Sequence, residues 1–414
     1  MNLELLPAAA TARGGAVPVV WGGSGPSALR TTIDPWFTSW GTLTPAGVGL
    51  GRIGTAVFLA DRMARRPQRT LARDLRLVIH VPDPSVLAPT LDPLVEVLRW
   101  VTGDTWAIEL VPDRTAVTGQ PVIPALAKRI GLLSGGLDSY CGAILSHTGD
   151  IAYLGHGDAS NVRTAQNGVI DWFHTNGVTL DMETVWLMPP VRTGREPTRR
   201  SRASFFVLLA AALADAKGAE EIEIPENGFT SINPPLGPNR GGVWTTRSTH
   251  PRTLALLNEV LDAASMAVTL VNPYELYTKG ELVAAARQAA TAMADFDKGL
   301  AATQSCAKAD GRFFGGSPSD NCGLCFACIV RRGGTISAVG SDPTTYLVDS
   351  LPPPKRDLLI ARRRADINAV RSIVHRGVTK LRLAVSGPFA DTPFDDVHDL
   401  CERSLKELGG VPLP

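Results

Sequence analysis

The sequence predicts an α/β protein that is built around a parallel sheet and carries further segments at both ends. From Lys128 onward, short apolar strands alternate with amphipathic helical stretches, a pattern typical of βαβ units. The residues before it are rich in Gly, Pro and Trp, and a basic helical stretch follows Pro352. With 414 residues and 44% hydrophobic content, the chain is long enough to bury a large core divided among two or three domains. We expect an N-terminal accessory domain (1–126), a central domain (127–350) and a helical C-terminal extension (351–414).

The first part, residues 1–126, is predicted to form a small α+β domain. A strand is expected over Asp74–Val81, a helix over Leu91–Val101 and a second strand over Thr105–Val111. The stretch Thr118–Leu126 contains two prolines and is interpreted as the linker to the next domain. Because this part has no chemical motif, we expect it to serve packing or contact with a partner.

The central part contains the predicted parallel sheet. Helical stretches such as Ala203–Gly218 separate its strands. Ligands of such sheets bind at the carboxyl ends of the strands, so the loops there are the expected place for a site. The predicted strands are 129–133, Ile151–Gly157, Thr184–Pro189, Glu221–Asn227 and Ala267–Asn272.

Acidic and basic residues are balanced, with 41 Lys and Arg against 40 Asp and Glu. This balance gives no reason to expect a dedicated nucleic-acid or membrane-surface binder, and the basic C-terminal stretch is interpreted as a solvated helix face. The N-terminus lacks the features of a signal peptide, and no apolar run has the length of a membrane span. We therefore expect a cytoplasmic protein.

The strand 129–133 leads directly into the sequence SGGLDS, after which a helical apolar pattern begins. The two glycines allow backbone N–H groups to approach an anion, and the start of the helix presents its positive end to it. A phosphate or pyrophosphate is the expected guest, and the alternative is a turn that only joins strand to helix. The motif is not Walker A, because Lys and Ser or Thr do not follow the second glycine. The predicted anion-binding residues are Ser134, Gly135, Gly136, Leu137, Asp138 and Ser139.

Four of the six cysteines lie within a short stretch. Cys322, Cys325 and Cys328 are each separated by two residues, a spacing that places thiolates around one tetrahedral ion, and Cys306 can supply the fourth ligand. Four thiolates without a water molecule form a structural site, so we expect Zn2+ with a role in folding. The alternative is a set of buried thiols without a ligand.

These motifs resemble those of a known superfamily. SGGLDS is similar to the PP-loop of the N-type ATP pyrophosphatases, which split ATP into AMP and pyrophosphate. Asn272–Ala286 (NPYELYTKGELVAAA), the cysteine segments SCAKADG and CGLCFACIVRR, and Asp342–Tyr346 (DPTTY) resemble the QueC family, the 7-cyano-7-deazaguanine synthases. The resemblance covers about residues 128 to 346. It implies the Rossmann-like PP-loop fold, also called the adenine nucleotide alpha hydrolase fold, with ATP and Mg2+ as cofactors.

The resemblance implies a C–N ligase that activates a carboxylate. An oxygen of the acid attacks the α-phosphorus of ATP, pyrophosphate leaves, and an amine then displaces AMP from the acyl adenylate. In the QueC family the acid is 7-carboxy-7-deazaguanine and the amine is ammonia. A second ATP then dehydrates the amide to a nitrile.

The resemblance also suggests which side chains act on the phosphates. Lys279 aligns with the family's lysine and is the first candidate for the cation at the α-phosphate, and Arg202 is the second. Asp138 either orients the loop or helps to hold Mg2+. The ordinary alternatives are an exposed lysine, a surface arginine and a carboxylate at a helix N-terminus. Arg331 and Arg332 could reach the nucleotide or lie at a helix start.

Two segments depart from the QueC pattern, residues 155–166 and Ile224–Arg252. Such loops at the carboxyl ends of strands usually determine specificity. The alternative is that part of the second segment is an ordinary long loop. The candidate substrate contacts are Glu226, Asn227, Asn233, Arg247 and His250.

The altered segments and the added terminal parts resemble the QatC type of QueC-like protein from antiphage systems. That resemblance implies a defence role, a partner protein from the same operon and, as a hypothesis, a protein amine in place of ammonia as acceptor. The QueC resemblance also favours a homodimer. Two other classes stay open: a tRNA-modifying adenylase that grips RNA with its basic C-terminal stretch, and a catalytically silent nucleotide-binding scaffold.

Overall fold

The computed structural model describes residues 1–67, 72–115, 121–157, 159–190, 196, 198, 200–236, 246–308 and 310–414. The predicted linker and the two segments that depart from the QueC pattern therefore lie partly outside the described residues. The strands are β1 (Asn2–Pro7), β2 (Val17–Trp21), β3 (Arg30–Thr31), β4 (Asp74–Val81), β5 (Thr105–Pro112), β6 (Arg129–Leu132), β7 (Ile151–His156), β8 (Met182–Val185), β9 (Leu187–Met188), β10 (Glu221–Glu223) and β11 (Thr269–Val271).

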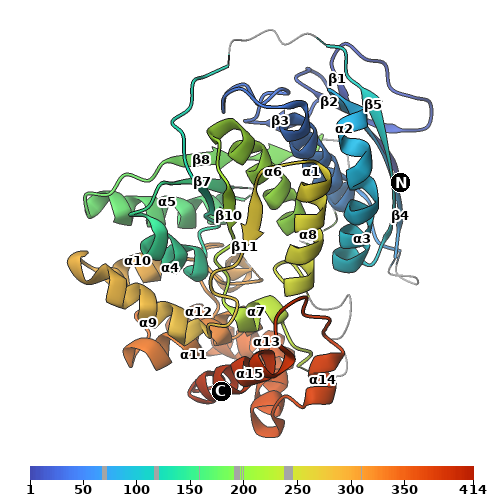
Figure 1. The fold of residues 1–414 in the computed structure, drawn as a ribbon. Coiled ribbons are helices and arrows are strands. Elements are labelled where there is room, and N and C mark those ends of the chain that lie inside the picture. The colour runs from blue at the N-terminus through green and yellow to red at the C-terminus, as the bar shows by residue number, and fades with distance from the viewer. Residues whose placement is uncertain are drawn as a thin grey trace.

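Helices cover both sheets and form the C-terminal end of the molecule (Figure 1). They are α1 (Pro45–Met63), α2 (Pro84–Leu87), α3 (Leu91–Thr102), α4 (Leu137–Ser146), α5 (Ser160–Thr175), α6 (Arg202–Lys217), α7 (Gly228–Ile232), α8 (Pro251–Ala263), α9 (Lys279–Ala289), α10 (Phe296–Ala302), α11 (Phe326–Val339), α12 (Leu347–Ser350), α13 (Pro353–Arg376), α14 (Lys380–Ala384) and α15 (Phe394–Gly409). The prediction of an α/β fold with a parallel sheet and a helical C-terminal region is confirmed.

The central sheet has the strand order β11-β10-β6-β7-β8, and all its neighbouring strands pair in parallel. β6 comes first in the chain and lies in the middle, so the later strands are added first on one side of it and then on the other. The register brings Ile130 opposite Ala152 on β7 and Ile222 on β10. The end of β6 is therefore the point at which the strand order reverses, where ligands of open α/β sheets bind.

The two faces of this sheet are buried against different helices. Ile130 and Leu132 of β6 belong to the buried cluster that includes most of α6, whereas Leu133 packs with α4 and Tyr140. Tyr153 of β7 lies on the same side as Tyr140. Because side chains alternate along a strand, these neighbouring residues point to opposite faces. Both faces are therefore apolar, as expected of a parallel sheet covered by helices.

The N-terminal part contains a second sheet, in the order β2-β1-β4-β5, and again all neighbouring strands are parallel. The prediction of an α+β domain is thus corrected to an α/β arrangement. The reason is the connections: α1 lies between β2 and β4, and α2 and α3 lie between β4 and β5, so the chain returns across the sheet before β4 and again before β5. The predicted strands and helix at 74–111 are observed.

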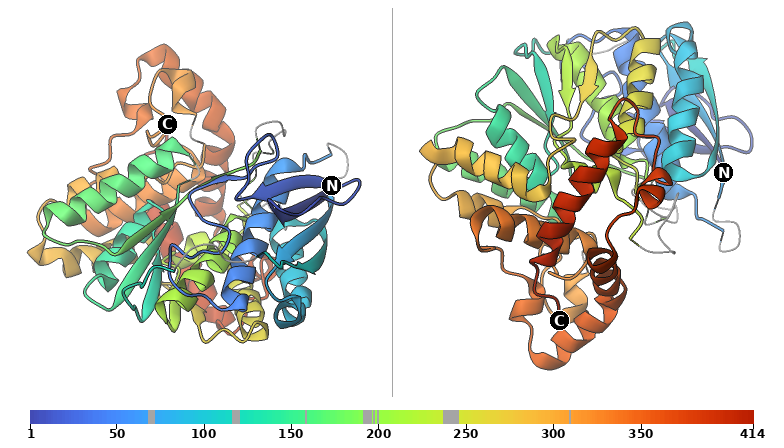
Figure 2. Two further views of the ribbon diagram at one scale, coloured as in Figure 1. Left: turned by 90° about the horizontal axis from the view of Figure 1, so that it is seen from above. Right: turned by 60° about the horizontal axis from the view of Figure 1, so that its bottom comes forward.

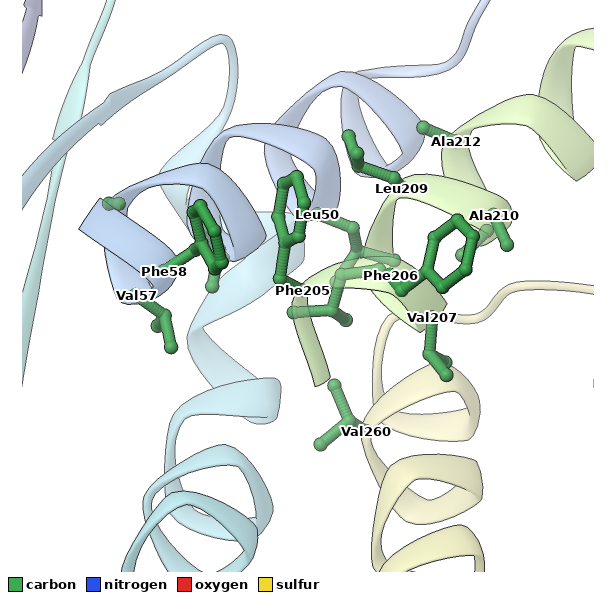
Figure 3. Packing of buried hydrophobic residues seen from close by; sticks show 14 of the residues in the cluster. Leu50, Val57, Phe58, Phe205, Phe206, Val207, Leu209, Ala210, Ala212 and Val260 are labelled. Carbon is green, nitrogen blue, oxygen red and sulfur yellow. The ribbon is translucent and has the colours of Figure 1, made fainter. Parts of the chain in front are cut away.

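α1 and α6 join the two sheets. Phe58 of α1 stacks on Phe205 of α6, with ring centroids 4.6 Å apart (Figure 3). Gly54 of α1 faces Leu208, and an added Cβ there would lie 3.0 Å from the Leu208 Cβ. One continuous buried cluster, from Leu3 to Leu270, therefore runs through both the N-terminal part and the central sheet.

A buried ionic network reinforces this junction. Asp61 at the end of α1 forms an ion pair with Arg73, which also binds Asp104. The second carboxylate oxygen of Asp61 accepts hydrogen bonds from the Ser201 hydroxyl (2.7 Å) and backbone N–H (3.2 Å). Ser201 is the residue before α6. The N-terminal part therefore holds the beginning of the helix that carries Arg202.

The C-terminal helices α13, α14 and α15 gather at one end of the molecule, away from the N-terminal sheet (Figures 1 and 2). α15 packs on α7 and α11 through a cluster that includes Phe229, Ile329 and Leu400. In the part of the chain that the structure describes, no helix combines the length and apolarity required to cross a membrane.

Candidate functional site

The glycine turn follows the central strand β6 and opens α4. Gly135 adopts a positive φ of 80°, and the Ser134 hydroxyl accepts a hydrogen bond from the Gly136 N–H at 3.2 Å. The Ser139 hydroxyl lies 3.2 Å from the Ser134 hydroxyl and donates to the Gly136 carbonyl at 2.9 Å. Helix α4 begins at Leu137, and the first N–H groups of a helix have no partner within it. The turn thus places two hydroxyls and a helix N-terminus together, a combination suited to an anion.

Gly135 has no room for a side chain. A Cβ at this position would lie 2.9 Å from the backbone nitrogen of Gln166 and 3.1 Å from the Ala165 Cβ. The Gly135 carbonyl also accepts a hydrogen bond from the Gln304 N–H at 3.0 Å. The turn is therefore held between α5 and the segment that leads to the cysteines.

Pyrophosphate is the probe for the predicted anion site, and replacing Gly135 with Ala should weaken its binding at least tenfold and lower the free energy of unfolding. The positive φ alone costs about 1–2 kcal/mol for a residue with a Cβ, and the contact with Gln166 adds roughly 1–3 kcal/mol of overpacking. Gly177→Ala is the matched control, because Gly177 has a φ of 76° and no atom within 4 Å of an added Cβ. Calorimetric titration and urea unfolding measure both effects. Equal losses in the two variants would contradict the special packing of Gly135.

A buried ion pair lies below the turn. Asp138 and Lys279 are only 6% and 7% exposed, and the Lys279 ammonium donates to one oxygen of the Asp138 carboxylate. Asn227 donates to the other oxygen from its side chain at 2.9 Å and from its backbone at 3.3 Å. Burial would raise the pKa of Asp138, but the charge of Lys279 and the hydrogen bonds hold it below its ordinary value. Asp138 is therefore kept as a carboxylate.

Glu226 lies next to this pair and is only half-buried. Burial, followed by the charge and hydrogen bond of Asp138, raises the pKa of Glu226 well above its ordinary value. Its Oε1 lies 3.4 Å from the Asn227 side-chain nitrogen. The two carboxyl groups thus have opposite pKa shifts, so that one is ionised and the other tends to hold a proton. Such a pair of carboxyl groups is typical of functional sites.

Two cavities meet at the turn. The larger, of about 280 Å³, is lined by Glu226, Phe206 and the hydroxyl residues Thr230, Thr246, Ser248 and Thr249. The smaller, of about 210 Å³, is lined by both turn glycines and by residues 304–307. Ser134 and Arg202 line both cavities. The guanidinium of Arg202 also donates to the His156 carbonyl at 3.3 Å.

The four predicted zinc ligands form one buried cluster, with their sulfur atoms all within 4.8 Å of one another. The Cys306–Cys325 and Cys322–Cys328 sulfur distances are each 3.9 Å. A tetrahedron with Zn–S bonds of ~2.3 Å has S–S edges of about 3.8 Å. The arrangement therefore fits Zn2+. Since Cys306 and Ala307 also line the smaller cavity, the cysteine cluster supports a wall of the site.

Arg331 is fully buried and forms hydrogen bonds to the segment that leads into this wall of the smaller cavity. It donates to the Thr303 hydroxyl (2.6 Å), the Leu300 carbonyl (2.7 Å) and the Thr344 hydroxyl (2.9 Å). It also reaches the Ser305 hydroxyl at 3.3 Å. Among the described residues, no carboxylate pairs with it within 4 Å. Arg331 therefore anchors the segment beside the smaller cavity, while adding positive charge to the region where an anion would bind.

The predicted residues thus fall into four groups. Ser134, Gly135, Gly136, Ser139, Arg202 and Glu226 line the cavities, and Asp138, Asn227 and Lys279 form the buried layer next to them. Asn227 also caps α7, because its side chain accepts from the Thr230 N–H at 3.1 Å. Leu137 is buried in the core beneath α4. The other three candidates, Asn233, Arg247 and His250, are not among the described residues that line these cavities.

Asn233, Arg247 and His250 instead contact neighbouring residues of the fold. Asn233 ends α7 with a φ of 45° and donates to the Thr246 carbonyl at 3.1 Å. The guanidinium of Arg247 lies 3.6 Å from the ring centroid of Trp100. His250 is 1% exposed, stacks on Phe389 and caps α8 by accepting from the Arg252 N–H. Their roles as substrate contacts stay predictions.

The pKa of His250 predicts a loss of stability in acid. Burial, together with the charge of Arg247, lowers this pKa from 6.5 to about 4. The folded protein therefore binds fewer protons than the unfolded chain between these values, and stability falls as the pH decreases through that window. The expected loss is on the order of 3 kcal/mol. His250→Asn retains a capping oxygen and should have a shallower decline in urea unfolding free energy from pH 6.5 to 4; the same slope in both proteins would contradict this.

Several lining residues were not predicted. Gln304 and Ser305 lie beside the cysteine ligand Cys306, and Thr246, Ser248 and Thr249 lie within the second divergent segment. The sequence Thr-Thr-Arg-Ser-Thr, with four hydroxyl side chains in five residues of the divergent segment, is a usable signal for these residues.

Comparison with models of known protein families finds no match, and no curated protein is significantly similar in sequence.

Proposed function

We propose that the protein is a QueC-like ligase that adenylates a 7-carboxy-7-deazaguanine-type acid with ATP and transfers the acyl group to an amine. The observation that carries this proposal is the junction of two cavities at Ser134 and Arg202. One cavity has the features of an anion site, and the other is large enough for a small heterocyclic acid. A reaction between a carboxylate and the α-phosphorus of ATP requires such neighbouring sites.

In this proposal the polyphosphate lies against the glycine turn, with the hydroxyls of Ser134 and Ser139 and the start of α4 as donors. Arg202 lies where the cavities meet and stabilises charge that develops at the α-phosphate. Mg2+ would neutralise the leaving pyrophosphate and would be held mainly by the phosphates, because both oxygens of Asp138 already have partners and Glu226 favours the protonated form. The acid oxygen forms the new bond to phosphorus as pyrophosphate departs.

The larger cavity is proposed to hold the acid. Its wall carries hydroxyls and Glu226, whose raised pKa favours the protonated form. A neutral carboxyl group both donates and accepts, as does the amide-like edge of a deazaguanine ring. The apolar ring of Phe206 offers a surface for the heterocycle. The acceptor amine is ammonia or, in an antiphage role, an amine of a partner protein.

The test is mass spectrometry of small molecules and intact proteins after incubation of the full chain with Mg-ATP and 7-carboxy-7-deazaguanine. One sample contains ammonia and a second contains the proteins encoded beside this one. AMP with free amide or nitrile supports a small-molecule synthase, whereas a protein that gains the acyl mass supports a protein ligase. If no AMP forms in either sample, the proposal is wrong, and salt-sensitive tRNA binding then tests the tRNA-modifying class.

A further inference from the structure

The helix that carries Lys279 begins in contact with the C-terminal helix α15. Thr278 is the N-cap of α9, and its hydroxyl donates to the carboxylate of Glu407 on α15. The backbone N–H of Gly280, the second residue of α9, donates to both oxygens of the same carboxylate at 3.1 Å. Glu407 thus binds the residue before Lys279 and the residue after it.

A second pair of residues adds to this contact. Arg403, one turn before Glu407 on α15, forms an ion pair with Glu281 and donates to the Leu276 carbonyl at 3.1 Å. Glu281 itself completes the capping box of α9 by accepting from the Thr278 N–H at 2.9 Å. Several hydrogen bonds and one ion pair therefore connect α15 to the first turn of α9 and to the residues before it.

The backbones of these helices are closely packed at this junction, beside a cavity of about 590 Å³ that is lined by Gly280, Arg403 and Glu407. A Cβ on Gly280 would lie 2.5 Å from a carboxylate oxygen of Glu407, and one on Gly334 of α11 would lie 2.4 Å from the Lys279 Cγ. The Gly333 Cβ position is likewise 2.8 Å from the Glu407 carbonyl oxygen. Three helices, α9, α11 and α15, therefore meet around the stem of Lys279, and they lie side by side in Figure 1.

The electrostatic arrangement favours the same geometry. The carboxylate of Glu407 lies at the positive end of α9, where an anion is stabilised. It satisfies a backbone N–H that helix geometry leaves without an internal partner. At the other end of the Lys279 side chain, the ammonium binds the buried Asp138. The C-terminal extension thus holds the backbone at the start of α9, next to Lys279. Asp138 of α4, the helix that follows the glycine turn, holds the Lys279 ammonium.

We propose that Glu407 is a positioning residue: by holding the first turn of α9, it sets the place of Lys279 and so of the Lys279–Asp138 pair beneath the ATP site. This inference rests on the proposed function only for its catalytic consequence. It assigns to the C-terminal extension a role in the site, although the extension lines neither of the two cavities at the glycine turn.

The experiment compares full-length Glu407→Ala, Glu407→Gln and Glu402→Ala with wild type. Glu402 lies on the same helix and has no contact with the first turn of α9 among those described, so it is the matched control. Lysine acetylation followed by mass spectrometry measures the labelling rate of Lys279 relative to exposed lysines such as Lys298. We expect Lys279 to label at least five times faster in Glu407→Ala, less so in Glu407→Gln, and at the wild-type rate in Glu402→Ala.

The catalytic readout is AMP formation with Mg-ATP and 7-carboxy-7-deazaguanine. We expect kcat to fall about tenfold or more in Glu407→Ala with a change in the KM for ATP below threefold, and Glu407→Gln to recover part of kcat. Unchanged Lys279 labelling in a folded Glu407→Ala variant, or the same change in Glu402→Ala, would overturn the proposal. Should Glu407→Ala fail to fold, the isosteric Glu407→Gln decides by the same criteria. A wild-type protein that forms no AMP contradicts the proposed function alone, because the labelling result still decides the positioning role.

Discussion

Lys279→Met is expected to reduce AMP formation by a factor on the order of 100, because loss of the buried pair displaces α4, the helix that follows the glycine turn, and to destabilise the fold by about 3–5 kcal/mol. Methionine has a similar length but carries no charge, so the Asp138 carboxylate is left buried without its cation. Its pKa then rises, because burial is no longer opposed by the lysine. Urea unfolding measures the stability, and AMP release measures the activity.

A double-mutant cycle identifies the origin of this effect. Asp138→Asn combined with Lys279→Met removes both charges, so the double variant should lose less stability than the sum of the single variants. Lys298→Met removes an exposed lysine and serves as the control. Additive losses in the cycle, or a Lys279→Met protein as stable as the control, would show that the buried pair does not have the role described here.

Cys325→Ser is expected to release zinc and to unfold the segment that carries the cluster. A structural zinc site contributes directly to folding, and its cysteines pack with Phe314, Tyr346 and Leu347 in one buried group. Because Cys306 and Ala307 line the smaller cavity, pyrophosphate binding should weaken more than tenfold with the loss of the metal. Metal analysis, thermal unfolding and calorimetric titration measure these three effects.

Cys401→Ser provides the comparison for this prediction. Cys401 is as deeply buried as Cys325 but lies in the separate cluster under α15. The variant should lose some stability through the buried hydroxyl while retaining its zinc and its affinity for pyrophosphate. A Cys325→Ser protein that kept a full equivalent of zinc would rule out the four-thiolate site.

The sequence predicted the central sheet and its glycine turn because their signals are local. The strand 129–133 and the helix 203–218 differ by one residue at their ends from β6 and α6. The spacing of the cysteines likewise identified all four members of the observed cluster. In each case the pattern lies within a few residues of the chain, where periodicity and ligand spacing are directly readable.

Other features could not be predicted, because their cause lies far away in the chain. Helix α1 contains four glycines, which disfavour a helix, yet an added Cβ at Gly51 would lie 2.4 Å from the ring of Phe37. The glycines therefore allow neighbouring side chains, such as that of Phe37, to pack directly against the backbone of α1. The contact of Glu407 with Gly280 spans 127 residues, and that of Asp61 with Ser201 spans 140. Likewise, the contacts of His250 and Arg247 with Phe389 and Trp100 depend on tertiary structure alone.

The buried cluster shared by α1 and α6 also constrains how the chain is made. On the ribosome α1 emerges long before α6, and roughly 140 residues at 5–20 residues per second correspond to about 7–28 s of synthesis. During that interval the face of α1 that packs on α6, including Phe58, lacks its cover, whereas other residues of α1 can already pack on β1 and β4. The N-terminal part is therefore expected to complete its packing only after α6 has been made. Ribosome-bound chains arrested before residue 202 should accordingly be more sensitive to protease than chains arrested after α6 has left the exit tunnel.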